Sequence, residues 1–349
     1  LYWLLGHRAL MDDPQRGRDL YEQSLALCRE CDDRQGIARA LDSLGTAGLF
    51  LGALDAARTW SEEALAIYRI REEDRCIARA LARLAEIALL QGRIDEADLL
   101  AQESVAKSRA LGNQPESAFA QLTWGAVLEA HGKLAAAESA LKICLAIYQD
   151  LGHHNYIASA HSELGSVNLH LGRYAEARAH ARTALALARQ HGPPFRVGFA
   201  GAVLGCVALA QGKPHQARRW LRKSLSVYQT MGARSGPGLG WCQALLGYAA
   251  CRRGDGDEAR VHLGEALRIG AEKGTIKPLT WALPAIALLL VDNGEIEQAL
   301  ALWYLAAKNP LVAMSQWFHD AGGGQLSAIA AALPPASVAA AQGRAHAWD

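Results

Sequence analysis

The sequence of 349 residues contains no long apolar run, so a membrane-spanning helix is not expected. The best candidate, residues 282–291, is too short and contains Pro284. The GxxxxGK[ST] pattern of a phosphate-binding loop is also missing. Glycine runs at 236–240 and 322–324 lack a preceding strand or a following Lys-Ser/Thr, so we interpret both as linkers.

Cysteine is sparse and gives no framework for disulfide bonds. The seven cysteines are odd in number and scattered, mostly where sister segments carry Ala, Ser or Val. Cysteine acts as a small buried hydrophobe at such positions, which predicts a reduced, cytoplasmic protein. The first ten residues, LYWLLGHRAL, lack an initiator Met and the basic region of a signal peptide. We therefore expect this chain to be a piece of a longer one.

What the sequence does contain is Ala and Leu, arranged in a regular internal repeat. Hydrophobic residues make up 51% of the chain and the mean hydropathy is -0.00. A glycine recurs every 40 residues, with a single interval of 42 before Gly254. These glycines are Gly52, Gly92, Gly132, Gly172, Gly212, Gly254 and Gly294. An alanine stands five residues after each glycine, and a Gly or Ala stands seven residues before it. A large apolar residue, such as Leu44 or Trp124, precedes that small residue in every copy.

The repeat has a direct physical interpretation as a pair of antiparallel helices. Small residues such as Gly45 and Ala57 let the two backbones approach, and the turn glycine ends the first helix in a left-handed conformation. A second kind of break separates repeats, at Leu111-Gly112, Leu151-Gly152, His191-Gly192, Met231-Gly232-Ala233 and Lys273-Gly274. One pair cannot bury its apolar face alone, so the pairs must stack into a continuous core.

The Leu-Gly pair in the first helix and the Ala in the second resemble the tetratricopeptide (TPR) signature over about residues 18–308. Segments 34–45 and 61–69 are similar to the repeats of bacterial STAND signalling ATPases and LuxR-type transcriptional regulators. Segments 309–318 and 331–335 resemble the closing part of those sensor domains. The resemblance implies an all-α, right-handed TPR superhelix (α-solenoid) of about seven to eight helix-turn-helix repeats. It also implies a nucleotide-binding module and a winged helix upstream.

The two ends of the array depart from the repeat. We expect a TPR-like array over residues 1–308, with a degenerate first helix pair at 1–30 in which residues 14–17 replace the usual turn. Residues 309–349 are expected to form capping helices and a tail, because a terminal repeat must present a wettable face.

No arrangement of residues predicts catalysis, a metal site or a cofactor. Histidines cluster at 153, 154, 161, 170, 180 and 191, but no pair has the spacing of three or four that a helical metal site uses. No Ser-His-Asp arrangement follows from the spacing, and no nucleophile elbow occurs. Any ATPase activity is expected in an upstream domain absent from this chain.

Charge is distributed unevenly. Residues 173–223 contain ten Lys/Arg and one acid, Glu176, although the whole chain has a net charge of +1. The candidate basic docking surface is Arg218, Arg219, Arg222 and Lys223. It would be either a solvated convex face or a dock for an acidic partner, such as the protein's own upstream domains. Nothing in the sequence favours nucleic acid.

The inner groove of a TPR array supplies the candidate ligand site. Two groove positions carried over from the family select Arg39, Arg79, Phe119, Phe199, Trp241, Tyr248 and Trp281. Rigid aromatic rings are good anchors for ligands, but the same rings could instead fill space between successive pairs. A co-chaperone carboxylate clamp is excluded, because its Lys and Asn positions hold Asp42 and Thr46 and then Ala82 and Glu86.

These features predict a sensor domain that binds an inducer on its concave surface and controls upstream ATPase and winged-helix modules. The inducer would be a protein, a peptide or a small molecule. The alternative is a constitutive protein–protein interaction scaffold or a TPR-class peptide receptor.

Overall fold

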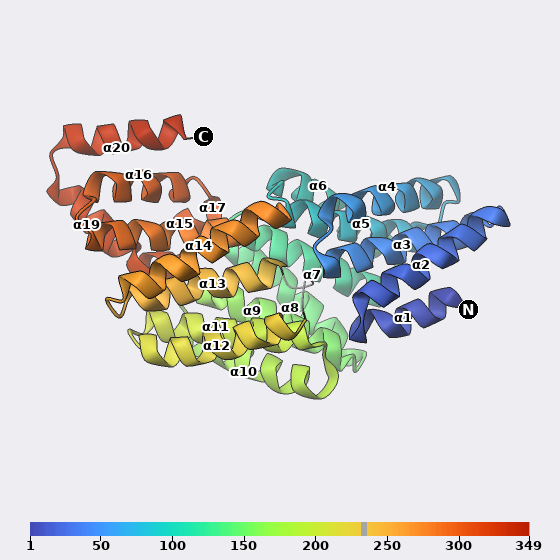
Figure 1. The fold of residues 1–349 in the computed structure, drawn as a ribbon. Coiled ribbons are helices and arrows are strands. Elements are labelled where there is room, and N and C mark those ends of the chain that lie inside the picture. The colour runs from blue at the N-terminus through green and yellow to red at the C-terminus, as the bar shows by residue number, and fades with distance from the viewer. Residues whose placement is uncertain (232–235, 349) are drawn as a thin grey trace.

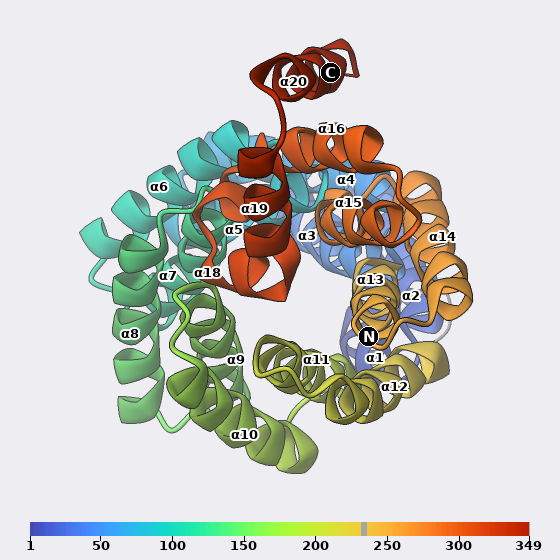
Figure 2. The same ribbon diagram turned by 90° about the vertical axis from the view of Figure 1, so that its left-hand side faces the viewer.

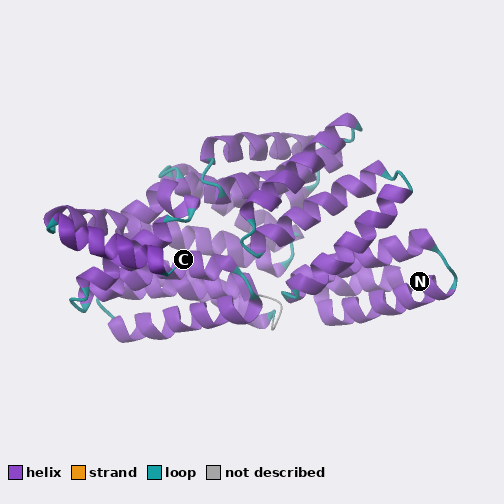
Figure 3. Cartoon of the chain, turned by 90° about the horizontal axis from the view of Figure 1, so that it is seen from above, coloured by secondary structure: helices purple, strands orange, loops and turns teal. Residues whose placement is uncertain are grey.

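A computed structural model describes residues 1–231 and 236–348, and these residues are helical with no β-strand among them (Figure 3). The inner helices of the array are α3 (Arg34–Leu51), α5 (Asp74–Leu90), α7 (Gln114–Ala130), α9 (His154–His170), α11 (Pro194–Ala210), α13 (Gly236–Cys251) and α15 (Ile276–Asp292). Their outer partners are α4 (Leu54–Ile70), α6 (Ile94–Ala110), α8 (Leu134–Asp150), α10 (Tyr174–His191), α12 (Pro214–Thr230), α14 (Gly256–Lys273) and α16 (Ile296–Ala307). The array begins with α1 (Tyr2–Asp12) and α2 (Pro14–Glu30).

The helix pairs follow one another around a ring, with the odd-numbered helices inside and the even-numbered helices outside (Figure 2). Seen from the side, the array runs as a superhelix from α1 at the right to α16 at the left (Figure 1). The expected all-α TPR solenoid is confirmed, with eight pairs in the described part of the chain.

Close packing within each pair depends on the small residues that the repeat places there. A Cβ added to Gly125, Gly205 or Gly247 would lie 2.6, 2.7 or 2.5 Å from a leucine of the outer partner helix. The alanines opposite, such as Ala57 and Ala217, have no exposed surface. The predicted contact points are therefore confirmed. Burial of the alanine and leucine faces between pairs supplies the hydrophobic stabilisation of the array.

The turn glycines have the left-handed backbone that the repeat predicted, for example φ 69° at Gly52 and 71° at Gly132. Two other expectations about breaks are wrong. Residues 14–17 form the first turn of α2 rather than a connection, because Asp13 caps that helix by accepting from the Arg16 N–H. The expected linker at 236–240 is the start of α13. Gly232 and Ala233, of the fourth break between pairs, lie outside the described residues.

Successive turns of the superhelix touch one another. The Phe50 ring at the end of α3 meets the Phe195 ring of α11 edge-on, with centroids 5.8 Å apart. Farther along, a Cβ added to Gly92 would lie 3.2 Å from Ile276, and one added to Gly132 would lie 2.9 Å from the Pro310 carbonyl oxygen. The loops that join inner to outer helices at Gly92 and Gly132 therefore pack against residues of a later turn of the superhelix.

After α16 the chain turns into the ring instead of continuing around it (Figure 2). The returning segment comprises α17 (Pro310–Met314), α18 (Gln316–Phe318) and the π-helical turn η2 (His319–Gly323). We call residues 310–323 the strap. It leads to α19 (Gly324–Ala332) and then to α20 (Pro335–Ala347), which packs on α16 through an Arg344–Glu297 ion pair of 2.8 Å.

The glycine run at 322–324 is not the predicted linker. A Cβ on Gly322 would lie 2.4 Å from Leu288, and one on Gly323 would lie 2.5 Å from Trp303. These glycines therefore allow the strap to pack closely. No helix in the described residues has both the length and the hydropathy needed to cross a bilayer.

Candidate functional site

The inside of the superhelix carries a series of six ionisable side chains, which we call the charge series. Glu86 of α5 interacts electrostatically with Arg196 of α11, and Glu163 of α9 interacts with Lys277 of α15. Since these helices are not neighbours in the array, the side chains meet on the inside of the ring. In order of their interactions, the charge series is Arg83, Glu86, Arg196, Glu163, Lys277 and Glu129.

The charges alternate in sign, whereas Arg83 at one end of the series pairs with Asp42 at 3.4 Å. In residues 1–231 and 236–348, Glu86, Glu163, Arg196 and Lys277 form no direct ion pair, and the buried Arg196 Nε has no hydrogen-bond partner. Burial raises the pKa of Glu86 and of Glu163 and lowers that of Arg196. Solvent nevertheless reaches the exposed Glu86 side chain. These groups are therefore accessible but poorly hydrated, as is common in binding sites.

Glu129 connects the charge series to the strap. Its carboxylate accepts a 2.6 Å hydrogen bond from Ser166 and lies 3.6 Å from His170 Nε2. The other ring nitrogen of His170 is 2.7 Å from the Ser315 hydroxyl of the strap. Burial is the largest cause of both pKa shifts: the pKa of Glu129 rises to about 7 and that of His170 falls to about 3. His170 is therefore neutral at physiological pH.

The strap covers an aromatic surface formed by the late repeats. Trp317 and Phe318 are fully buried, and the rings of both lie 4.8 Å from the Trp281 ring. The Trp317 indole donates a 2.9 Å hydrogen bond to the Cys206 carbonyl oxygen. Its ring also meets Tyr248 edge-on at 5.3 Å. Residues more than a hundred positions apart are thus joined at this place.

Three of the sequence-predicted groove residues are consequently not open to solvent. Trp241, Tyr248 and Trp281 are only 1%, 1% and 2% exposed. Trp241 packs on Trp281, and Tyr248 and Trp281 contact Trp317 of the strap. Phe199 is half-buried, with the Lys277 ammonium 4.9 Å from its ring centroid. The same ammonium lies 4.3 Å from the Trp241 ring.

The early groove residues lie at the other end of the array and are exposed or half-buried. Arg79 pairs with the buried carboxylate of Glu116 at 2.7 Å, and the half-buried Phe119 ring touches Tyr156. Arg39 stacks 4.5 Å over the Trp3 ring. The structure does not bring these three residues together with the late aromatic rings.

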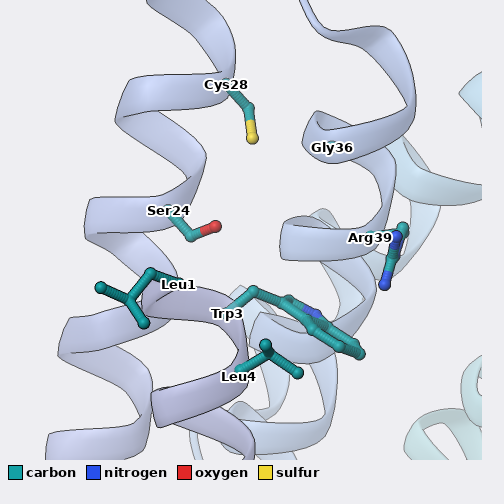
Figure 4. Close-up of a pocket in the computed structure, with 7 residues that line it drawn as sticks. All are labelled: Leu1, Trp3, Leu4, Ser24, Cys28, Gly36 and Arg39. Atoms are coloured by element: carbon teal, nitrogen blue, oxygen red, sulfur yellow. The ribbon is translucent and has the colours of Figure 1, made fainter.

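Arg39 and Trp3 line a surface pocket of about 280 Å³ at the amino-terminal end of the array (Figure 4). Its other lining residues come from α1, α2 and the start of α3, and include Ser24, Cys28 and Gly36. Figure 4 shows the Trp3 ring between the Leu4 side chain and Arg39. The Trp3 indole donates a 2.8 Å hydrogen bond to the Ser43 hydroxyl, which fixes the ring against α3.

The candidate basic docking surface on α12 is partly neutralised by its neighbour. Arg218 and Arg222 approach Glu258 of α14 at 2.9 and 3.4 Å. Although burial acts in the opposite direction, the Arg218 hydrogen bond and the Arg253 charge lower the pKa of Glu258 to about 2. Arg219 and Lys223 remain exposed.

Two of the clustered histidines come together despite their sequence spacing. His161 of α9 and His180 of α10 approach to 2.8 Å between their Nδ1 atoms, and burial lowers the pKa of His161 to about 4. The described residues contain no group of three or more His, Cys, Asp or Glu side chains arranged to hold a metal ion.

Sequence reasoning read Glu86 only as a groove charge and missed Glu129, Glu163, Arg196 and Lys277. Their signal is faint, since each is an isolated charge within or at the start of an apolar inner helix. Their relationship depends on contacts between helices three or four pairs apart, which a repeat pattern does not encode.

The sequence matches the model of the MalT-like TPR region over residues 45–236, more than half of the chain. The chain belongs to the MalT-like TPR region family. A tetratricopeptide-repeat model also matches residues 6–70. No curated protein matches the chain significantly.

Solved structures share the fold of this chain at low sequence identity. A Rap protein in complex with competence and sporulation factor superimposes with a TM-score of 0.70 at 13% identity, covering 99% of this chain and 96% of that one. NprR in complex with its cognate peptide NprX gives 0.62 at 13%, covering 94% and 96%. Aspartyl phosphate phosphatase F from Bacillus subtilis gives 0.53 at 15%, covering 94% and 90%.

Proposed function

We propose that this MalT-like TPR region is the sensor domain of a cytoplasmic STAND-type signalling ATPase or transcription regulator, and that it binds a peptide inducer on its inner wall. Binding would control upstream nucleotide-binding and winged-helix modules. The domain itself would carry out no chemistry. The observation that carries the proposal is the middle of the charge series, where the solvent-accessible Glu86, Arg196, Glu163 and Lys277 alternate in sign and form no ion pair among the described residues.

Unpaired charges inside a fold are costly, so a domain that retains several of them needs a compensating partner. A ligand that reaches Arg196 and Glu163 together would replace lost hydration with charge-assisted hydrogen bonds. The early groove residues Arg39, Arg79 and Phe119 would extend this wall toward the amino-terminal end.

A peptide fits this wall better than an ion of one sign. An extended main chain presents N–H donors and carbonyl acceptors in alternation, which match carboxylates and cationic groups respectively. The likeness of the fold to NprR, solved with its peptide NprX, agrees with this class of ligand.

A constitutive scaffold is the second candidate, supported by the exposed Arg219 and Lys223 on the outer face. If the chain were such a scaffold, an acidic partner would bind outside the ring, and the inner wall would have no ligand. The two functions therefore differ in which face of the molecule, inner or outer, binds the partner.

A displayed library of random heptapeptides, selected on the purified chain, tests the proposal. Peptides enriched on the wild type should bind the Arg196→Gln/Lys277→Gln variant at least about tenfold more weakly, because each lost charged hydrogen bond contributes about 1.5–3 kcal/mol. Arg219→Gln/Lys223→Gln is the matched control and should bind them normally. Enriched peptides that depend on the outer face instead would contradict the proposal, and circular-dichroism melts verify that both variants are folded.

A further inference from the structure

The place where the strap meets the late repeats has the features of a second binding site. Tyr248 and Trp281 form its floor, Trp241 packs against Trp281 behind them, and His170 forms one side; we call this the aromatic socket. The strap fills it with two adjacent rings, Trp317 and Phe318, both fully buried. Figure 2 shows the strap reaching into the ring from the α16 end, as a separate segment rather than as part of a helix pair.

The strap has little structure of its own. Its helical pieces contain only five, three and five residues, and Gly322 interrupts the last with a non-helical backbone. Helices this short do not persist without tertiary contacts. The conformation of the strap therefore depends on the aromatic socket, whereas each inner helix is held by a long outer partner and by both neighbouring pairs.

Few polar contacts hold the strap in place. Among the described residues, they are the hydrogen bonds between the Ser315 hydroxyl and His170, from the Trp317 indole to the Cys206 carbonyl oxygen, and from the Tyr174 hydroxyl to Asp320. In addition, the buried Trp241 Nε1 and Tyr248 Oη beside the strap have no hydrogen-bond partner among the described residues. A buried donor left unpaired disfavours the state that buries it. The strap thus matches the apolar shape of the socket but not its hydrogen-bonding groups.

We infer that the aromatic socket is a binding site for a peptide segment with adjacent aromatic residues, and that the strap is its displaceable intramolecular occupant. Release of the strap would expose Tyr248 and Trp281, ring types that often anchor protein partners. A partner segment that also offers acceptors to Trp241 and Tyr248 would compete with the strap.

His170 gives this exchange a route to the charge series. One ring nitrogen contacts Ser315 of the strap, and the other faces Glu129, which interacts with Glu163 and Lys277. A ligand that binds one strap state more tightly would shift the strap equilibrium, and the effect is reciprocal. The existence of the socket does not depend on the inner-wall ligand.

The test uses the full chain with Trp317→Ala/Phe318→Ala, which empties the aromatic socket, and a fluorescent peptide of residues 309–324 as the probe. The peptide should bind this variant at least about tenfold more tightly than it binds the wild type, where the strap competes. A peptide with alanine in place of both aromatic residues is the matched control and should not bind. A folded variant that ignores the native peptide would overturn the inference.

Hydrogen exchange on the wild-type chain decides the matter if the variant does not fold. Amides of residues 315–323 should exchange by local opening, with protection at least about tenfold below that of α11 and α13. Equal protection of the strap and these helices would make the strap a fixed part of the core and overturn the inference. Neither measurement uses an inner-wall ligand, so either can fail while the proposed function stands.

Discussion

At the scale of single residues, Glu129 shows how the fold perturbs an acid. Its side chain is 12% exposed and faces Ser166, His170, Glu163 and Lys277. Burial and the nearby Glu163 carboxylate disfavour its charged form, while the Ser166 hydrogen bond and the Lys277 charge oppose them. The net effect raises its pKa from 4.5 to about 7. The acid therefore changes charge within the physiological range of pH.

This shift predicts the pH dependence of a Glu129→Gln variant. A carboxyl whose pKa is raised by folding stabilises the protein fully below its unfolded pKa, and this stabilisation is lost as pH rises through the folded pKa. The free energy of unfolding of wild type relative to the variant should therefore fall by about 1–3 kcal/mol between pH 5 and pH 8. Urea titrations across this range measure it, and a difference independent of pH would show that Glu129 is not perturbed.

His170 opposes Glu129 in the same network. Burial lowers its pKa to about 3, so the stabilisation from keeping it neutral is present above its unfolded pKa and is lost as pH falls. The wild type and the Glu129→Gln variant both retain His170, so the direct contribution of His170 cancels in the difference between their unfolding free energies. Stability at any one pH thus combines two opposed titrations.

At the scale of elements, the glycine turns have two separate functions. Gly132 and Gly212 end inner helices with nearly equal left-handed angles, φ 71° and 68°. Only Gly132 lies under the strap, where a Cβ would approach the Pro310 carbonyl oxygen and Met314 to 2.9 Å. Gly212 has no neighbour within 4 Å of the same point. One glycine is needed for its angle alone, and the other also for space.

Alanine substitution at the two positions separates these functions. Gly212→Ala should lower the free energy of unfolding by about 1–2 kcal/mol, the cost of a left-handed non-glycine residue. Gly132→Ala should cost this amount and a further ~1–3 kcal/mol, because the strap must shift. Chemical denaturation of both variants checks the prediction. Equal losses of unfolding free energy in the two variants would show that α17 moves away from the added methyl group at no energetic cost.

At the scale of the molecule, contacts between turns make this solenoid more than a row of neighbouring repeats. In a simple repeat array each unit touches only the next, so stability is a sum of local terms. Here Phe50 of α3 meets Phe195 of α11, and the turn at Gly92 meets Ile276 of α15. Early and late repeats should therefore stabilise one another directly.

A double-mutant cycle on Phe50→Ala and Phe195→Ala measures this coupling. Edge-to-face aromatic pairs contribute about 0.5–1.5 kcal/mol beyond their burial, so the double variant should lose less stability than the sum of the single variants by that amount. Phe50→Ala combined with Phe119→Ala is the control and should be additive, since Phe119 packs on Tyr156 instead. Additivity in both cycles would mean that the turns touch without supporting one another.

Most of the array was predictable because it is local. Small residues at fixed offsets determine where two helices can approach, and turn glycines determine where one helix ends, so the TPR pairing follows from spacing alone. The candidate site was predictable only in part. A groove position tells which face a residue occupies. Whether Tyr248 is open or covered depends on Trp317 of the strap, which stands about seventy residues later in the chain.

The sequence by itself determined the repeat, the helix pairs and the solenoid, because each depends on contacts between residues close in the chain. Only the tertiary structure decided that Tyr248 and Trp281 lie beneath the strap, and that Glu86, Arg196, Glu163 and Lys277 share one inner wall. The physical reason is superhelical curvature. Small rotations between neighbouring pairs add up around the ring, and their sum brings distant helices together.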